Sequence, residues 1–177
     1  MHLGFDVQGM IRLLEDIPYE KRDLKWAESR TDFEKLKKQG INFKIVQASQ
    51  TLTKEKNTLR GMHFQTGPKA EDKIVRCTRG KVFDVAIDLR QNSTTFGQWV
   101  GEELSEDNKK MFLIPKGFAH GFQTLTDNCE LLYFMSEFYS GEHASGVRFD
   151  DTLFNITWPL SNPFTAEKDK NWPLTTL

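Results

Sequence analysis

Cysteine is scarce in this sequence. Its two cysteines, Cys77 and Cys129, follow no CxxC spacing, and neither has a histidine nearby in the sequence. A pair of this kind in a chain of 177 residues indicates reduced, packed thiols, with a single disulfide as the alternative. The spacing also gives no support to a cysteine nucleophile.

An excess of charge and long apolar runs are missing as well. Lys and Arg number 24 against 25 Asp and Glu, and the pI is near 6.4. This balance provides no overall field for nucleic acid or an anionic membrane. The apolar runs are far shorter than the roughly 20 residues of a membrane span. The first ten residues lack a basic region followed by an apolar one, so we expect no signal peptide and a cytoplasmic protein.

Helical periodicity is also rare. One helix is predicted from a capping box at Thr31–Glu34 to Gly40, and a short helical turn around Ala166–Lys170. The rest reads as short strands between turn residues, which favours an antiparallel sandwich or barrel. The predicted strands are Ile41–Ala48, Leu59–Gln65, Lys73–Cys77, Val82–Asp88, Gln98–Leu104, Met111–Ile114, Gly121–Leu125 and Glu130–Ser136.

Neither a repeat nor a linker interrupts the chain, so residues 1–177 are expected to form one domain. Within it we expect an N-terminal strand and helix in 1–40, a barrel in 41–158 and an irregular tail in 159–177.

Two of the four histidines, His63 and His120, lie in strand-like apolar contexts, whereas His2 is terminal and His143 is in a Ser/Gly-rich loop. A lone histidine of this kind is more often a hydrogen-bonded core residue than a functional one. The predicted strands also carry further polar residues, which are Arg60, Lys73, Asp84 and Tyr133. These neighbours favour a small-molecule site in the mouth of the barrel.

The sequence allows two orientations for the Asp84 side chain. It shares a strand face with Val82 and Ala86, opposite an apolar face formed by Phe83, Val85 and Ile87. If its face points inward, the carboxylate needs a partner such as Lys73. If it points outward, the apolar face forms the core.

Metal and cofactor signatures are absent from the sequence. The histidines form no HxH pair and precede no carboxylate at ligand spacing, so we expect no metal. No nucleophile elbow, Walker motif or dinucleotide-binding glycine pattern occurs, so we expect no cofactor.

The segment Leu59–Gln65 resembles the LRGxHxQ signature of dTDP-4-dehydrorhamnose 3,5-epimerases. Further blocks match in the same order over roughly residues 41–173, and they begin at Lys73, Gly80, Thr95, Ile114, Leu132, Tyr139 and Trp158. The resemblance implies a mainly β fold, an antiparallel cupin-like jelly-roll barrel with one or two short helices. It also implies a homodimer and a nucleotide-linked 4-keto-6-deoxyhexose as the substrate.

The resemblance also implies a proton-transfer set. His63 is similar to the family's base, Asp169 to the carboxylate that orients this base, and Tyr133 to the acid on the opposite face of the sugar. Lys73 resembles the cation that faces the enolate oxygen.

The remaining matches concern substrate binding. Asp84 is expected to hold Lys73, His120 to contact the sugar, and Arg60 to bind the pyrophosphate. Further substrate-binding positions are Arg22, Trp26, Gln47, Ser49 and Tyr139. Strict alternation places Arg60 and His63 on opposite faces of one strand, so we expect a bend or bulge at Gly61.

The chain departs from the family pattern mainly on the nucleotide side. Asp23 replaces a glycine, Ser49 an asparagine and Phe64 a tyrosine. Either a dTDP- or a CDP-linked substrate therefore remains open. Alternatives to the 3,5-epimerase are a 3- or 5-epimerase of a branch pathway, a non-catalytic sugar-nucleotide binding barrel and a metal-dependent cupin oxygenase.

Overall fold

The computed structural model describes residues 12–14, 37 and 42–175. The substrate-binding positions Arg22 and Trp26 lie outside these residues. The helix predicted from Thr31 to Gly40 also lies outside them, except at Lys37, which is helical. Within the described part of the chain, no helix is long and apolar enough to cross a membrane.

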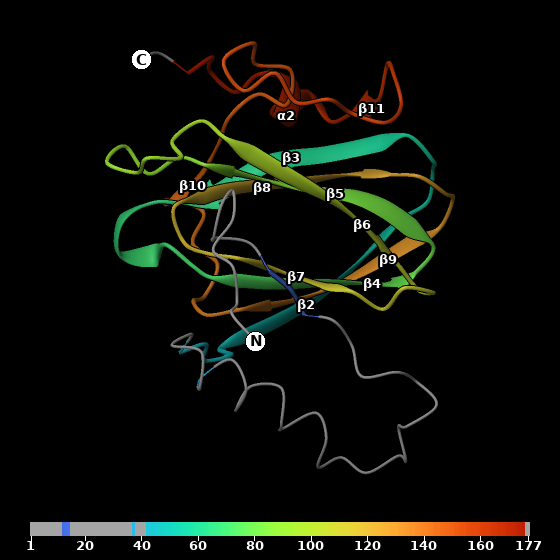
Figure 1. Cartoon of the computed structure of the whole chain (residues 1–177), viewed down its shortest axis with the longest axis horizontal. Helices are drawn as coiled ribbons and strands as arrows, with labels where there is room; N and C mark the ends of the chain where they lie inside the picture. Colours follow the sequence, from blue (N-terminus) through green and yellow to red (C-terminus); the bar gives the residue numbers. More distant parts are fainter. Residues whose placement is uncertain (1–11, 15–36, 38–41, 176–177) are drawn as a thin grey trace.

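Two antiparallel sheets face each other (Figure 1). The five-stranded sheet has the order β1 (Arg12–Leu14), β7 (Met111–Ile114), β4 (Lys73–Arg79), β9 (Cys129–Met135) and β2 (Gln47–Thr53). The six-stranded sheet contains β10 (Ala144–Gly146), β3 (Thr58–Gln65), β8 (Phe118–Thr124), β5 (Lys81–Asp88) and β6 (Trp99–Ser105), and β11 (Phe164–Thr165) pairs with β3 in parallel. The helical elements with described bounds are η2 (Gly67–Lys69) and α2 (Glu167–Lys170). The mainly β, antiparallel prediction is confirmed.

The main core lies between the two sheets. Its buried side chains include Val75 and Phe112 from the five-stranded sheet and Val82 and Phe122 from the six-stranded sheet. Cys77 and Cys129 belong to the same cluster, and both are free thiols, as predicted. Burial raises the pKa of Cys77 to about 12, so this thiol stays protonated at neutral pH.

A second apolar layer covers the outer face of the six-stranded sheet. Met62, Val85 and Ile87 pack there against Val147 and Phe154 from the segment after β9. The C-terminal segment with β11 and α2 lies over the same sheet (Figure 1). Both faces of β5 are therefore buried. Its apolar face packs under the second apolar layer, and Asp84 on the other face is fully buried beside Val82 and Ala86, which face the main core.

Two predicted strands differ from the structure by three or more residues at one end or both. The strand predicted at Ile41–Ala48 is wrong for residues 42–46, because β2 begins at Gln47. Its partner β9 ends at Met135, and the Val46 amide donates a hydrogen bond to the Met135 carbonyl at 3.0 Å. The strand predicted to begin at Gly121 begins at Phe118 instead.

Candidate active site

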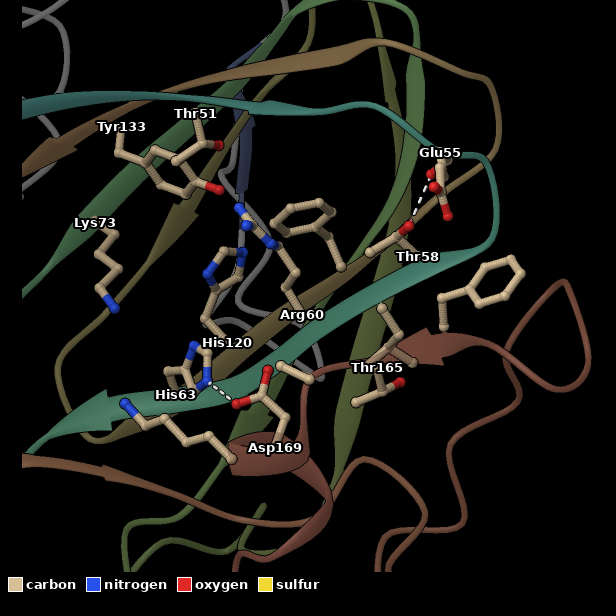
Figure 2. A pocket seen from close by; sticks show the side chains of 15 residues that line it. Thr51, Glu55, Thr58, Arg60, His63, Lys73, His120, Tyr133, Thr165 and Asp169 are labelled. Carbon is tan, nitrogen blue, oxygen red and sulfur yellow. Dashed lines mark hydrogen bonds and ion pairs between the residues drawn. The ribbon is translucent and has the colours of Figure 1, made fainter.

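A cavity of about 630 Å³ opens between the sheets and the C-terminal segment (Figure 2). Side chains from both sheets, β11 and α2 contribute to its wall. The lining residues are Thr51, Glu55, Thr58, Leu59, Arg60, His63, Lys73, His120, Phe122, Tyr133, Phe164, Thr165, Ala166, Lys168 and Asp169. Six of the predicted site residues therefore meet in one cavity, although they come from widely separated parts of the sequence.

His63 and Asp169 form a hydrogen-bonded pair in the wall of this cavity. His63 Nε2 lies 2.6 Å from Asp169 Oδ1, and the backbone N–H of Gly61 donates to Asp169 Oδ2 at 3.1 Å. The Asp169 side chain is 5% exposed and the His63 side chain 40%. Burial acts to raise the pKa of Asp169, but the hydrogen bonds from His63 and Gly61 outweigh it and lower the pKa.

This pairing determines which nitrogen of His63 can act as a base. An ionised carboxylate only accepts hydrogen bonds, so the proton of the neutral imidazole resides on Nε2. Nδ1 then carries the free lone pair. The imidazolium formed when Nδ1 takes up a proton lies directly against the negative charge of Asp169, which stabilises it.

The expected distortion at Gly61 is present. The pairing register between β3 and β8 shifts between Arg60 and His63, and both residues line the cavity despite their odd spacing. Gly61 has a φ of 135° and is joined to Met62 by a cis peptide bond. A Cβ at Gly61 would lie 2.5 Å from the Cα of Gly121 in β8, so this close approach of the two backbones requires glycine.

His120, another residue of the cavity wall, is held by Asp84. His120 Nε2 lies 2.7 Å from Asp84 Oδ1, and the Asp84 side chain is fully buried. Burial raises the pKa of Asp84, and the charges of His120 and Lys73 act against this rise.

The partner of Lys73 differs from the prediction. Asp84 was expected to hold this lysine, but Lys73 Nζ pairs with Glu71 Oε1 at 3.0 Å. The imidazole of His120 takes the Asp84 oxygen instead, because β5 and β8 are neighbours and place the two residues two positions apart along the shared ladder.

Tyr133 enters the cavity from the other sheet. It lies on β9 of the five-stranded sheet, whereas His63 lies on β3 of the six-stranded sheet. Its ring meets that of His120 edge to face, with the centroids 6.3 Å apart. Burial raises the pKa of Tyr133, so the phenol keeps its proton throughout the neutral range.

Three predicted substrate-binding residues form a separate group beside the cavity. Gln47 Nε2 donates to Ser49 Oγ at 3.4 Å, and the Tyr139 backbone N–H donates to Gln47 Oε1 at 3.0 Å. The structure brings these residues together but does not place them in the cavity wall. Tyr139 is 64% exposed, so its ring is free to contact a ligand.

Several residues that line the cavity were not predicted from the sequence. Thr51 follows Ser49 by two positions on β2, and this strand alternation could have identified it. Phe164 and Thr165 come from the irregular tail, where no periodic pattern indicates their direction, and Lys168 lies in the predicted helical turn, which is too short for periodicity to show which side chains face the cavity. Among the described residues, no group of three or more His, Cys, Asp or Glu side chains could hold a metal ion.

Comparison with known sequences identifies the family. The family model for dTDP-4-dehydrorhamnose 3,5-epimerase matches residues 26–176, which is most of the chain. The chain belongs to this family.

Individual members of the epimerase family agree with this assignment. The chain is 49% identical over 116 residues to a dTDP-4-dehydrorhamnose 3,5-epimerase of Shigella flexneri, a match that covers 66% of this chain and 64% of the relative. The match therefore spans slightly less than two thirds of that relative's length.

Solved structures of the epimerase family also resemble this chain. The dTDP-4-dehydrorhamnose 3,5-epimerase of Bacillus anthracis, with TDP and PPi bound, is 42% identical at a TM-score of 0.78, covering 80% of this chain and 81% of that one. A dTDP-6-deoxy-D-glucose-3,5-epimerase of Legionella pneumophila, in complex with dTDP-4-keto-L-rhamnose, is 34% identical at a TM-score of 0.78, covering 90% and 84%. The cupin-like β fold implied by the sequence resemblance is confirmed.

Proposed function

We propose that this chain is an isomerase that epimerises a nucleotide-linked 4-keto-6-deoxyhexose, acting as a dTDP-4-dehydro-6-deoxy-D-glucose 3,5-epimerase. One observation carries the proposal: a histidine base and a tyrosine acid reach the same cavity from opposite sheets, His63 from β3 and Tyr133 from β9. Inversion at a carbon needs this arrangement, because the proton leaves one face of the sugar and another arrives on the opposite face.

The first step is proton abstraction next to the ketone. The 4-ketone acidifies the hydrogens on C3 and C5, and His63 Nδ1 takes one of them while Asp169 stabilises the resulting imidazolium. The electrons of the broken C–H bond form an enolate at C4. Lys73 provides a positive charge in the cavity wall for the enolate oxygen, where a fixed charge is worth more than in water.

The second step is protonation from the other side. Tyr133 gives its phenolic proton to the carbon, and the ketone is restored. The raised pKa of Tyr133 ensures that the phenol carries this proton at neutral pH. Proton exchange with solvent then returns His63 to the neutral base and Tyr133 to the phenol, and a second cycle at the other carbon converts both centres.

A diphosphate suits the charge of the same cavity. Arg60 and Lys168 add two cationic side chains to its wall, and a guanidinium can bind phosphate oxygens through two hydrogen bonds. The bound TDP of the Bacillus protein and the bound dTDP-sugar of the Legionella protein favour a dTDP-linked substrate over a CDP-linked one.

Deuterium incorporation tests the proposal. The purified protein is incubated in heavy water with dTDP- or CDP-4-keto-6-deoxyglucose, and NMR locates the deuterium. Exchange at both C3 and C5 of the dTDP sugar is expected. Exchange at one carbon would identify a 3- or 5-epimerase instead, and no exchange with either sugar would favour a non-catalytic binding barrel.

We also propose a homodimer, by analogy with the family pattern. Light scattering on the purified chain at several concentrations measures its mass directly. A mass near twice 20.5 kDa is expected. A mass near 20.5 kDa at all concentrations would contradict the dimer.

A further inference from the structure

Lys73 has a buried acidic neighbour that is not part of the cavity wall. Its Nζ lies 3.0 Å from Glu71 Oε1, and the two side chains are 14% and 7% exposed. Glu71 precedes β4 and does not line the cavity, whereas Lys73 does. A contact between two such shielded charges holds both side chains more firmly than an ion pair on the open surface.

A second carboxylate lies within electrostatic range of the same ammonium group. Asp84 is fully buried, and within the described residues its Oδ2 atom is buried without a hydrogen-bond partner. Lys73 is close enough for its charge to act on this carboxyl group. A buried acceptor without a partner attracts any donor that can reach it. Two carboxylates therefore act on the Lys73 ammonium, and in this structure Glu71 forms the ion pair with it.

We propose that Glu71 is a positioning residue of the epimerisation: it keeps the Lys73 ammonium at the cavity wall and prevents it from pairing with Asp84. This inference rests on the proposed function, in which Lys73 faces the enolate oxygen. An ammonium drawn back towards Asp84 would lie further from this oxygen and would stabilise the transition state less. Glu71 acts through Lys73 and touches no substrate.

The variant Glu71→Gln tests this role, because it keeps the size of the side chain and removes its charge. We expect kcat to fall on the order of tenfold and KM to change by less than about twofold, since the interaction with the enolate oxygen exists only in the transition state. The matched control is Glu137→Gln, which removes a similar pair on the surface: Lys69 Nζ lies 3.1 Å from Glu137 Oε1, and the side chains are 37% and 30% exposed. This control should keep the wild-type kcat.

A double-mutant cycle with Lys73→Met separates positioning from a structural role. If Glu71 acts through Lys73, Glu71→Gln has no further effect on deuterium exchange once Lys73 is Met. If it merely supports the loop before β4, it lowers exchange equally in both backgrounds, and this would overturn the inference. An unchanged kcat in Glu71→Gln would overturn it too.

The wild-type protein, assayed first, keeps this test apart from that of the proposed function. Wild-type exchange with a 4-keto-6-deoxy sugar is required before the variants are compared. Its absence would refute the proposed function, whereas normal wild-type exchange with an unaffected Glu71→Gln would refute only the role of Glu71. Thermal melting of each variant confirms that it is folded.

Discussion

The sharpest prediction concerns Asp169→Asn, because the structure determines how the new amide must orient. The Gly61 N–H donates to Asp169 Oδ2 and needs an acceptor there. An asparagine meets this need by turning its carbonyl oxygen towards Gly61. Its NH₂ group then faces His63 Nε2, which must become an acceptor. The proton of the imidazole moves to Nδ1, so the nitrogen that should take the substrate proton no longer has a free lone pair.

Two effects determine the size of the loss. A unit charge pair about 4 Å apart is worth about 4 kcal/mol at an effective dielectric constant near 20. Because the His63 side chain is 40% exposed, water reduces this to about 3 kcal/mol, or about a hundredfold in rate. The wrong tautomer adds to this loss, so Asp169→Asn should reduce kcat by about 10³ to 10⁴.

Asp169→Ala separates these two effects. It removes the charge but does not force the tautomer, so it should reduce kcat by only about 10² and remain at least tenfold more active than Asp169→Asn. The assay is the rate of deuterium incorporation, with Asp150→Asn as a control in an exposed ion pair with Arg148. An Asp169→Asn variant that exceeds Asp169→Ala, or that falls within tenfold of wild type, would refute the assignment of Nδ1 as the base.

Two further predictions concern the opposite wall and the acid stability of the fold. Tyr133→Phe should abolish epimerisation, whereas the exchange of substrate hydrogen with solvent that depends on His63 should partly persist. If NMR shows that epimerisation and exchange are lost to the same extent, the separate roles of His63 as base and Tyr133 as acid are contradicted. Asp88 is buried and accepts hydrogen bonds from Arg90, Ser93 and Thr95; burial would raise its pKa, but these bonds lower it. Because the pKa of Asp88 is lower in the folded state than in the unfolded state, ionised Asp88 stabilises the fold. This stabilisation is complete above the ordinary carboxyl pKa near 4 and is lost as the pH falls through the pKa of Asp88 in the folded state. Asp88→Asn should therefore lower the free energy of unfolding by about 2–3 kcal/mol at pH 7 and by less below pH 4, as urea unfolding at several pH values would measure. A loss of stability that is the same at all pH values would contradict the role of the charge.

Much of the fold was predictable because strand alternation and turn residues are local signals. The strand predicted at Met111–Ile114 matches β7 completely, and Val82–Asp88 differs from β5 by one residue. Residues 42–46 were predicted as part of a strand from the same alternation, but within the described part of the chain the neighbouring strand β9 ends at Met135, opposite Gln47. A strand needs both a pattern and a neighbour, and only the pattern is visible in the sequence.

The candidate site also has features that the sequence could predict and features that it could not. The bulge at Gly61 followed from strand geometry together with the family resemblance, which put Arg60 and His63 in one site that strict alternation could not allow. The partner of Lys73 could not be predicted in this way. Glu71 lies two residues before Lys73, outside any strand, and no periodic rule gives its direction.

The mistaken partner of Lys73 has a physical explanation with a consequence for the chemistry. Asp84 Oδ1 is hydrogen-bonded to His120, because β5 and β8 are adjacent strands, whereas Asp84 Oδ2 is buried without a hydrogen-bond partner among the described residues. The sheet ladder therefore pairs Asp84 with a histidine, and Lys73 finds its ion-pair partner, Glu71, in the loop before β4. A charge held from a loop is less firmly fixed than one held across a ladder. The position of Lys73 therefore depends on a residue outside the barrel strands, and substitutions in the segment before β4 should alter catalysis without altering the barrel.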